Sequence, residues 1–106
     1  MARYVFVVHT NAVEGRDDEF NDWYSGPHLV DLRRLPGVVS ARRFRIAETQ
    51  VREQPSSHRY LAIYEIETDD PQGFARELRA RAGTELLATS PALAADASAY
   101  LWEQIE

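Results

Sequence analysis

The sequence predicts a single α+β domain in which a four-stranded antiparallel sheet carries two main helices on one face. The first reason is the order of its segments: four stretches rich in aromatic and β-branched residues combine with two helical patterns as strand, helix, strand, strand, helix, strand. The second reason is size, since 106 residues can bury one hydrophobic core without disulfides but not two. With 44% hydrophobic and 27% charged residues, the composition is that of a folded globular chain. Residues 1–106 are therefore expected to form one domain.

The first strand and the first helix are predicted at residues 3–10 and 17–35. The strand is aromatic or β-branched on both faces, so both faces are expected to be mostly buried. In the helix, a spacing close to 3.6 residues puts five side chains near one stripe: Phe20, Tyr24, His28, Asp31 and Leu35. Pro27 cannot donate a hydrogen bond to the carbonyl of Trp23, so the helix is expected to kink or restart at Gly26–Pro27.

A proline and a glycine, Pro36–Gly37, end the first helix and lead into a second strand predicted at residues 38–46. Residues 48–57 are polar and contain Pro55, which indicates a hairpin loop. This loop is longer than a tight turn. We therefore expect it to be the least ordered internal segment and to gate or border a binding pocket.

The second half of the chain adds a strand, a helix and a strand. The third strand is predicted at residues 58–67, where side chains alternate between two largely apolar faces. The acid and proline at Asp70–Pro71 are typical of a helix start, and this second helix should end near Gly83. Residues 84–95 are predicted as a connection with one short helical turn, and residues 97–105 as the fourth strand.

The order of these elements, βαββαβ, is that of the ferredoxin-like fold. Two helices can cover only one face of such a sheet, yet the first and third strands are apolar on both faces. A second copy of the sheet is the expected cover, so the sequence predicts a homodimer. Obligate interfaces of this kind commonly bury more than about 2,000 Å² in total.

Composition excludes several kinds of chemistry. The chain has no Cys, which excludes disulfides, thiolate catalysis and iron–sulfur clusters. All twelve basic residues are Arg, which excludes Schiff-base catalysis by Lys and suggests a GC-rich bacterial genome. The net charge of −5 argues against nucleic acid as a partner. The three His, at positions 9, 28 and 58, lack the spacing of metal ligands, so we expect no metal. We also expect no cofactor, with haem ligation by His28 as an alternative that the sequence does not support.

No targeting signal is visible in the sequence. No apolar run approaches the roughly 20 residues of a membrane-spanning helix, and the first residues lack the features of a signal peptide. We therefore expect a cytoplasmic protein with no membrane partner.

The first helix holds the densest group of chemically useful side chains. Tyr24 and His28 are four residues apart and Asp31 follows three residues later, so on a continuous helix the three share one side. An imidazole between a phenol and a carboxylate can transfer a proton, because the carboxylate fixes its tautomer and His titrates near neutral pH. Alternatively, His28 is a buried structural histidine with Asp31 as its partner, and Trp23 and Tyr24 are core packing.

Arg42, Arg43 and Arg45 form a basic stretch on the second strand. They could bind an anionic group, or they could form salt bridges with Glu65, Glu67 or a partner chain. We favour salt bridges, because the net charge is negative and no glycine-rich phosphate loop accompanies the three Arg.

These patterns together resemble the EthD-like proteins of the dimeric α/β-barrel superfamily. The specific residues lie in the first helix and second strand, with an aromatic third strand after them: Trp23, Tyr24, His28, Asp31, Pro36, Gly37, Arg42, Arg43, Phe44, Tyr60 and Tyr64. The resemblance covers most of the chain in element order. It implies a homodimer whose two sheets form a shared barrel, with a mostly apolar pocket between each sheet and its helices.

By this resemblance, His28 is the expected acid/base or ligand-orienting residue, with Tyr24 and Asp31 beside it as catalytic partners. Five aromatic side chains are expected to bind the substrate: Phe20, Trp23, Tyr60, Tyr64 and Trp102. The pair Gly26–Pro27 departs from the more regular helix of close relatives, so the direction in which His28 points is left open.

Three functions are compatible with these residues, because relatives in the superfamily carry out several reactions and some bind haem. The first is a cofactor-independent lyase, cyclase or isomerase that acts on a hydrophobic, aromatic or polyketide-like small molecule through proton transfer at His28. The second is a cofactor-free monooxygenase, in which an electron-rich phenolic substrate itself reduces oxygen. The third is a non-catalytic ligand-binding or accessory protein of a degradation pathway.

Overall fold

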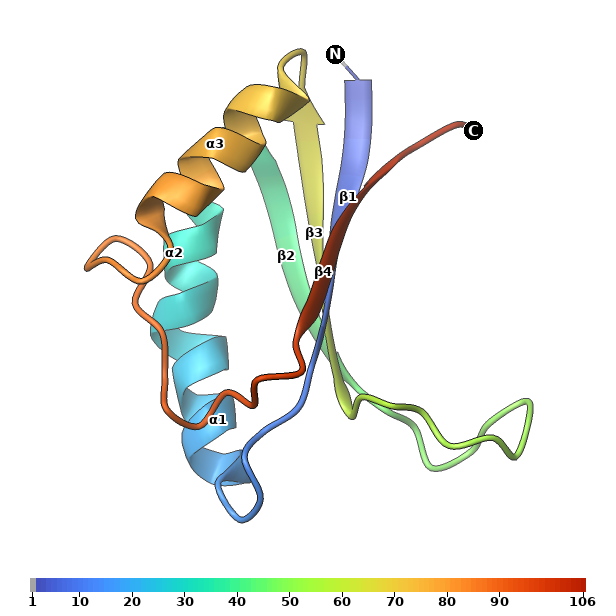
Figure 1. The fold of residues 1–106 in the computed structure, drawn as a ribbon. Coiled ribbons are helices and arrows are strands. Elements are labelled where there is room, and N and C mark those ends of the chain that lie inside the picture. Colours follow the sequence, from blue (N-terminus) through green and yellow to red (C-terminus); the bar gives the residue numbers. More distant parts are fainter. Residues whose placement is uncertain (1) are drawn as a thin grey trace.

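Helices pack on one side of a four-stranded sheet in the computed structural model, which describes residues 2–106 (Figure 1). The elements are β1 (Ala2–Thr10), α1 (Asp17–Trp23), η1 (Tyr24–His28), α2 (Leu29–Arg33), β2 (Val38–Arg45), β3 (Tyr60–Thr68), α3 (Pro71–Arg81) and β4 (Ser98–Glu103). With the first helix counted as one interrupted element, the order is βαββαβ, and the predicted α+β, ferredoxin-like fold class is confirmed. Within residues 2–106, no helix has the length and apolar character needed to span a membrane.

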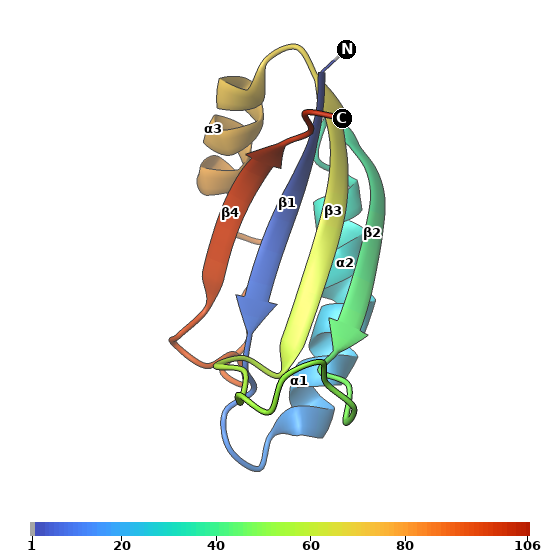
Figure 2. The ribbon, with the colours of Figure 1, turned by 90° about the vertical axis from the view of Figure 1, so that its right-hand side faces the viewer.

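The sheet has the strand order β2-β3-β1-β4, and all neighbouring strands are antiparallel (Figure 2). Phe6 in the middle of β1 lies opposite Tyr64 of β3 and Leu101 of β4. These three side chains pack into the core below the helices. Because side chains alternate along a strand, the next pair, Val7 and Ile63, faces the opposite side.

Aromatic side chains fill most of the core between the sheet and the helices. The largest fully buried side chains are Phe20, Tyr24, Tyr64 and Ile66. The ring of Phe6 lies 5.9 Å from that of Tyr64 and 5.9 Å from that of Phe74, which joins β1 and β3 to α3. Fully burying a side chain of this size stabilises the fold by about 1.5–3 kcal/mol.

The first helix is interrupted where the sequence predicts it. Gly26, inside η1, departs from helical geometry with φ −95° and ψ −107°. The backbone N–H of Leu29 reaches back to the carbonyl of Tyr24, five residues earlier, which is the hydrogen bond of a π-helix. Pro27 has no N–H to donate, so a regular helix would lose a bond at this position. The kink predicted at Gly26–Pro27 is confirmed.

The connection between α3 and β4 differs from the prediction. Residues 84–95 form turns and isolated bridges, and they contain no helical turn. The reason is that part of their backbone is bonded to a distant segment: the carbonyl of Ala92 accepts the N–H of Val13 at 2.7 Å, and the N–H of Ala94 donates to Asn11 at 3.0 Å. These bonds fasten the connection to the chain before α1.

Two strand ends differ from the prediction by two residues, and the other differences are of one residue. β3 begins at Tyr60 rather than at His58, because the ring nitrogens of His58 contact the hydroxyl of Ser57 and the carbonyl of Asp96 outside the sheet. β4 ends at Glu103 rather than at residue 105.

The face of the sheet away from the helices has an apolar centre. At its centre are the half-buried side chains Val5, Val7, Leu61 and Ile63. Beside them, Tyr100 is 66% exposed and Trp102 is 59% exposed. Large apolar patches of this kind on a single chain usually mark an interaction surface.

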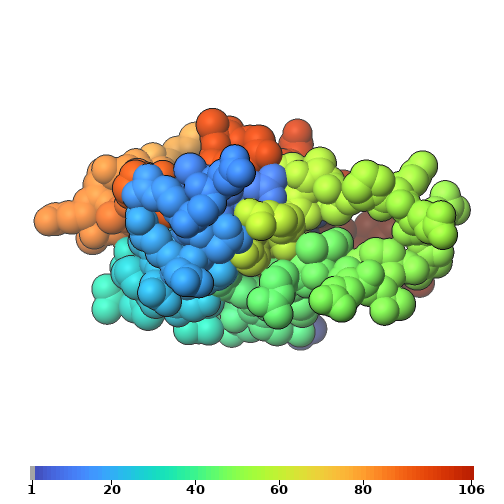
Figure 3. All heavy atoms as spheres, turned by 90° about the horizontal axis from the view of Figure 1, so that it is seen from below, coloured from blue at the N-terminus to red at the C-terminus, as the bar shows by residue number. Residues whose placement is uncertain are grey.

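The loop between β2 and β3 projects away from the body of the molecule, on the side of the sheet opposite the helices (Figures 1 and 3). The hairpin closes with a hydrogen bond of 2.8 Å from Ile46 to Arg59, and no backbone–backbone hydrogen bond involves residues 47–58. Hydrogen–deuterium exchange should therefore be fastest, among internal segments, at the amides of residues 48–57. Amides in this loop that were as protected as those of β3 would contradict the prediction.

Candidate active site

His28, Trp23 and Tyr24 form an aromatic cluster at the break in the first helix. The centre of the imidazole lies 4.3 Å from that of the Trp23 ring, with the planes tilted by 30°, and 4.5 Å from that of Tyr24 at 79°. The indole Nε1 of Trp23 donates a hydrogen bond of 3.3 Å to the carbonyl of Ala88, which holds the ring against the connection before β4. The imidazole is thus flanked by an indole and a phenol.

The Nδ1 atom of His28 is buried, and among residues 2–106 it has no hydrogen-bond partner. Leaving a buried polar atom unpaired costs about 1–3 kcal/mol. Such atoms are few in native proteins, and some of them take part in catalysis. The nitrogen therefore has a hydrogen-bonding capacity that no described residue uses.

Asp31 does not orient the imidazole, which differs from the prediction. Its carboxylate lies 3.7 Å from the guanidinium of Arg34, and the Nδ1 of His28 stays unpaired. The reason is local, because Arg34 lies three residues further along the same helical turn and is a close neighbour of Asp31. Asp31 acts on His28 only through its charge.

Burial is the main influence on the acidity of His28. It lowers the pKa of the imidazole from 6.5 to about 4. The negative charge of Asp31 opposes this decrease, and the positive charge of Arg43 adds to it. His28 is therefore neutral at pH 7, with one ring nitrogen that can accept a proton.

The two central phenols, Tyr24 and Tyr64, are hydrogen-bonded to each other in the core, with their oxygens 2.8 Å apart. Burial raises the pKa of both phenols, and the neighbouring Tyr24 raises that of Tyr64 further. Both stay protonated at neutral pH, so neither supplies a phenolate base. Within the cluster, His28 is the group that can accept a proton at pH 7.

Arg43 belongs to the same cluster. Its guanidinium carbon lies 4.5 Å from the centre of the Tyr24 ring, within the range of a cation–π interaction. The guanidinium also donates hydrogen bonds of 2.8 Å to the Ser25 hydroxyl and 3.0 Å to the Asn21 side-chain oxygen. These contacts fix the guanidinium against the first helix.

Sequence reasoning assigned Arg43 to a salt bridge and so missed this role. Its neighbour Arg42, on the other face of β2, does form the predicted pair with Glu65, at 2.9 Å. The signal that could have identified Arg43 is the alternation of β2, which puts it on the same face as the buried Ala41. A charged side chain on the inward face of a strand needs a special environment.

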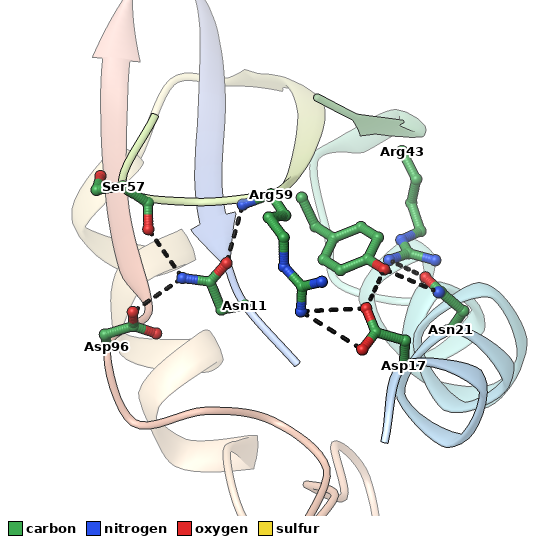
Figure 4. Close-up of polar contacts among 8 residues, drawn as sticks. Asn11, Asp17, Asn21, Arg43, Ser57, Arg59 and Asp96 are labelled. Atoms are coloured by element: carbon green, nitrogen blue, oxygen red, sulfur yellow. Dashed lines mark hydrogen bonds and ion pairs between the residues drawn. The ribbon is translucent and has the colours of Figure 1, made fainter. Parts of the chain in front are cut away.

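A chain of hydrogen bonds continues from Arg43 and Asn21 to the end of the sheet (Figure 4). Asn21 donates to the Tyr60 hydroxyl at 3.3 Å, and that hydroxyl donates to Asp17 at 2.6 Å. Asp17 also pairs with Arg59 at 3.1 Å. The hydrogen bond from Tyr60, and after it the charge of Arg59, lower the pKa of Asp17 against the opposing effect of burial. The carboxylate of Asp17 is thus ionised at pH 7 and has two partners.

The structure brings four of the five predicted substrate-binding residues together and leaves the fifth apart. The ring of Phe20 lies 5.1 Å from that of Tyr60 and 6.1 Å from that of Trp23, and Tyr64 packs in the same core. Trp102 lies on the opposite face of the sheet, because the register of β4 pairs it with Val5. It therefore does not line the same site.

An open hollow of about 210 Å³ adjoins the cluster at the edge of the sheet, lined by Asn21, Arg43, Phe44, Arg45 and Tyr60. The apolar pocket expected between the sheet and the helices is occupied by the fully buried rings of Phe20, Tyr24 and Tyr64. A ligand must therefore approach His28 from the side of this core.

Comparisons with known proteins identify the fold. No protein-family model matches the sequence, and no curated protein matches it. Among solved structures, an EthD-like protein from Ralstonia eutropha JMP134 is 15% identical, with a TM-score of 0.69 over 100% of this chain and 95% of that chain. This chain shares the ferredoxin-like fold of that protein.

Two further solved structures share this ferredoxin-like fold. The heme-degrader MhuD from Mycobacterium tuberculosis is 18% identical, with a TM-score of 0.64 over 97% of this chain and 96% of that chain. SnoaB from Streptomyces nogalater, a cofactor-independent oxygenase, is 18% identical, with a TM-score of 0.56 over 98% and 94%. At these identities the likeness shows the fold alone, and it confirms the resemblance predicted from the sequence at that level.

The described residues, 2–106, do not fit a metal site or a haem site. Within residues 2–106, no three His, Asp or Glu side chains come together as metal ligands. The imidazole of His28 is flanked within 4.5 Å by Trp23 and Tyr24, and its Nδ1 is buried. The adjoining hollow, at about 210 Å³, is smaller than the roughly 300–1,000 Å³ of sites for drug-sized ligands. The residues in this arrangement therefore do not fit a haem.

Proposed function

We propose that the protein is a small cofactor-independent enzyme that binds a hydrophobic, aromatic or polyketide-like molecule beside His28 and transfers a proton at that residue. The observation that carries the proposal is a neutral imidazole whose buried Nδ1 lacks a partner. The rings of Trp23 and Tyr24 on either side suit a flat apolar ligand. A substrate hydroxyl or activated C–H at Nδ1 would satisfy the unpaired nitrogen.

In this proposal His28 acts first as a base. The neutral imidazole takes a proton from a hydroxyl, or from a carbon next to a carbonyl, and leaves a phenolate or enolate. This negative charge next to the imidazolium raises the pKa of His28, so the proton is held until it is returned. Return to a different carbon gives an isomerase, whereas ring closure or loss of a leaving group gives a cyclase or lyase.

Access to Nδ1 involves Trp23. The indole is half-buried, and its Nε1 is held by a single hydrogen bond to Ala88 at 3.3 Å. We propose that the indole turns aside when a ligand enters and then covers the bound molecule, which would keep water from the reacting atoms.

The second candidate function is a cofactor-free monooxygenase. It is favoured by the likeness to SnoaB, a cofactor-independent oxygenase. The same proton removal at His28 would convert a phenolic substrate to an electron-rich phenolate, which itself reduces oxygen. The first chemical step is thus shared, and the fate of the anion separates the two enzymes.

The test begins with molecules retained by the purified protein, identified by mass spectrometry of the denatured sample. Where none is retained, a panel of phenols and 1,3-diketones replaces them. We expect the protein to accelerate product formation, with deuterium incorporated at carbon when the reaction runs in D₂O. Oxygen uptake on turnover would favour the monooxygenase. Ligand binding with neither product nor oxygen uptake would contradict both enzymes and favour the third function, a non-catalytic binding protein.

We also propose that the protein is a homodimer through the helix-free face of the sheet. The apolar side chains at its centre, Val5, Val7, Leu61 and Ile63, have no helices above them. Tyr100 adds a further exposed ring. Two such faces packed together would remove this apolar surface from water, which is the main driving force for obligate association.

Tyr100→Arg should convert the dimer to a monomer. Tyr100 is 66% exposed in a single chain, so the change places a charge on the interface without disturbing the core. Light scattering at micromolar concentration should give twice the chain mass for the wild type and the chain mass for the variant. Leu86→Arg, at a residue 56% exposed after α3, is the matched control and should stay dimeric. A wild-type monomer whose stability does not change on dilution would refute the proposal.

A further inference from the structure

Arg43 and Arg45 present two positive charges to the hollow beside the aromatic cluster. Alternate residues of β2 share a face, so both side chains lie on the helix side of the sheet. Both line the hollow of about 210 Å³. Among residues 2–106, neither has a carboxylate within 4.0 Å.

The carboxylates closest in the hydrogen-bond network do not neutralise these charges. Asp17 is occupied by Arg59 at 3.1 Å and by the Tyr60 hydroxyl at 2.6 Å (Figure 4). Glu65 lies on the other face of the sheet, where it pairs with Arg42. The hollow therefore keeps a net positive charge.

The half-buried guanidinium of Arg43 is held in a fixed position by neutral groups. It stacks on Tyr24 and donates to Ser25 and Asn21, which uses two of its five N–H donors. The remaining donors are free to bind a ligand in the hollow. Because the guanidinium of Arg43 is already held in place, it loses little conformational entropy when it binds a planar anion.

We propose that this hollow binds the carboxylate of a small aromatic acid. Arg43 and Arg45 supply the charge, because a guanidinium matches a carboxylate in a two-point contact. Tyr60 supplies an aromatic wall, and the hollow of about 210 Å³ has room for a molecule with one ring.

This inference rests on the proposed function for the step after binding, and it names the substrate class. The guanidinium of Arg43 and the imidazole of His28 each lie 4.5 Å from the ring of Tyr24. The proposed anchor and the proposed proton-transfer group therefore contact the same ring. The anchor would fix the orientation of the substrate relative to His28.

The test compares benzoate with benzamide, which have the same ring and nearly the same size but differ in charge at pH 7. Backbone amide NMR titrations of the wild type should show saturable benzoate binding, with shifts at residues 43–45 and at Tyr60. Benzamide should bind at least about tenfold more weakly, because hydrogen bonds to charged groups are the stronger ones. Arg45→Gln, at an exposed side chain, should weaken benzoate binding by roughly tenfold.

The controls separate local contact from net charge and from folding. Arg79→Gln removes an exposed Arg from α3 and should leave benzoate affinity unchanged. Arg43→Lys keeps the positive charge but loses the planar pair of N–H donors of the guanidinium. It should lower the affinity for benzoate, while the amide spectrum stays that of a folded chain. The inference would be overturned if benzoate and benzamide bound with equal affinity. It would also be overturned if Arg45→Gln and Arg79→Gln weakened benzoate binding equally.

Failure of this inference is distinguishable from failure of the proposed function. Benzoate binding is measured without turnover at His28. A protein that binds benzoate selectively but turns over no substrate contradicts the proposed function alone. A protein that turns over substrates but binds benzoate no better than benzamide contradicts the carboxylate site alone.

Discussion

His28→Gln should lower turnover of the true substrate by roughly 10²- to 10⁴-fold, the range typical of losing a general acid or base. Gln keeps hydrogen-bonding groups of similar reach but cannot accept a proton from the substrate. In the wild type the imidazole is neutral at pH 7, because burial lowers its pKa to about 4. Steady-state kinetics should show the loss mainly in kcat, since the aromatic walls of the site are unchanged.

Two further variants separate catalysis from packing at this position. If His28 only packs, Gln should be tolerated, and His28→Ala should lower the free energy of unfolding by removing the ring contacts with Trp23 and Tyr24, with little effect on kcat. His9→Gln is the matched control, because it makes the same change at an exposed histidine of β1. Equal activity of wild type and His28→Gln on an established substrate would remove His28 from the mechanism.

Most of the fold could be predicted because its signals are local. Alternation in β1 and β3 follows from the two-residue period of a strand. Asp70 caps α3 by accepting a hydrogen bond of 2.9 Å from the backbone N–H of Gly73. The break in the first helix was equally predictable, since proline has no backbone N–H in any structure and therefore cannot continue the hydrogen bonds of a helix. Residues 84–95 were less predictable, because their hydrogen bonds go to a segment near the other end of the chain.

The site was predictable only where it depends on neighbours in the sequence. His28 lies beside Tyr24 because the two are one helical turn apart. Arg43 reaches Tyr24 only after β2 has paired with β3, so sequence spacing carries no sign of that contact. Trp102 faces away from the site because of the register between β4 and β1, which a shift of one residue would reverse.

The free energy of unfolding should fall as the pH falls from about 6.5 to about 4, and His28 should account for up to about 3 kcal/mol of the loss. The imidazole has a pKa near 6.5 in the unfolded chain, and burial lowers it to about 4 in the folded protein. Between these values the unfolded chain binds a proton that the folded chain does not, so acid favours unfolding. One pKa unit corresponds to about 1.36 kcal/mol. The stabilisation is complete above pH 6.5 and lost below pH 4.

Urea unfolding of wild type and His28→Gln between pH 7 and pH 4 measures this contribution. The two proteins share every carboxylate, Asp17 included, so the difference between their stability curves isolates His28. Protein concentration must be the same in both series, because the stability of the proposed dimer would depend on it. We expect the wild-type curve to fall relative to that of the variant by up to about 3 kcal/mol across this window, with an NMR titration midpoint of the imidazole near 4. Stability curves that stay parallel for the two proteins, together with an NMR titration midpoint near 6.5, would mean that the imidazole is solvated. The unpaired buried nitrogen would then no longer support His28 as the base.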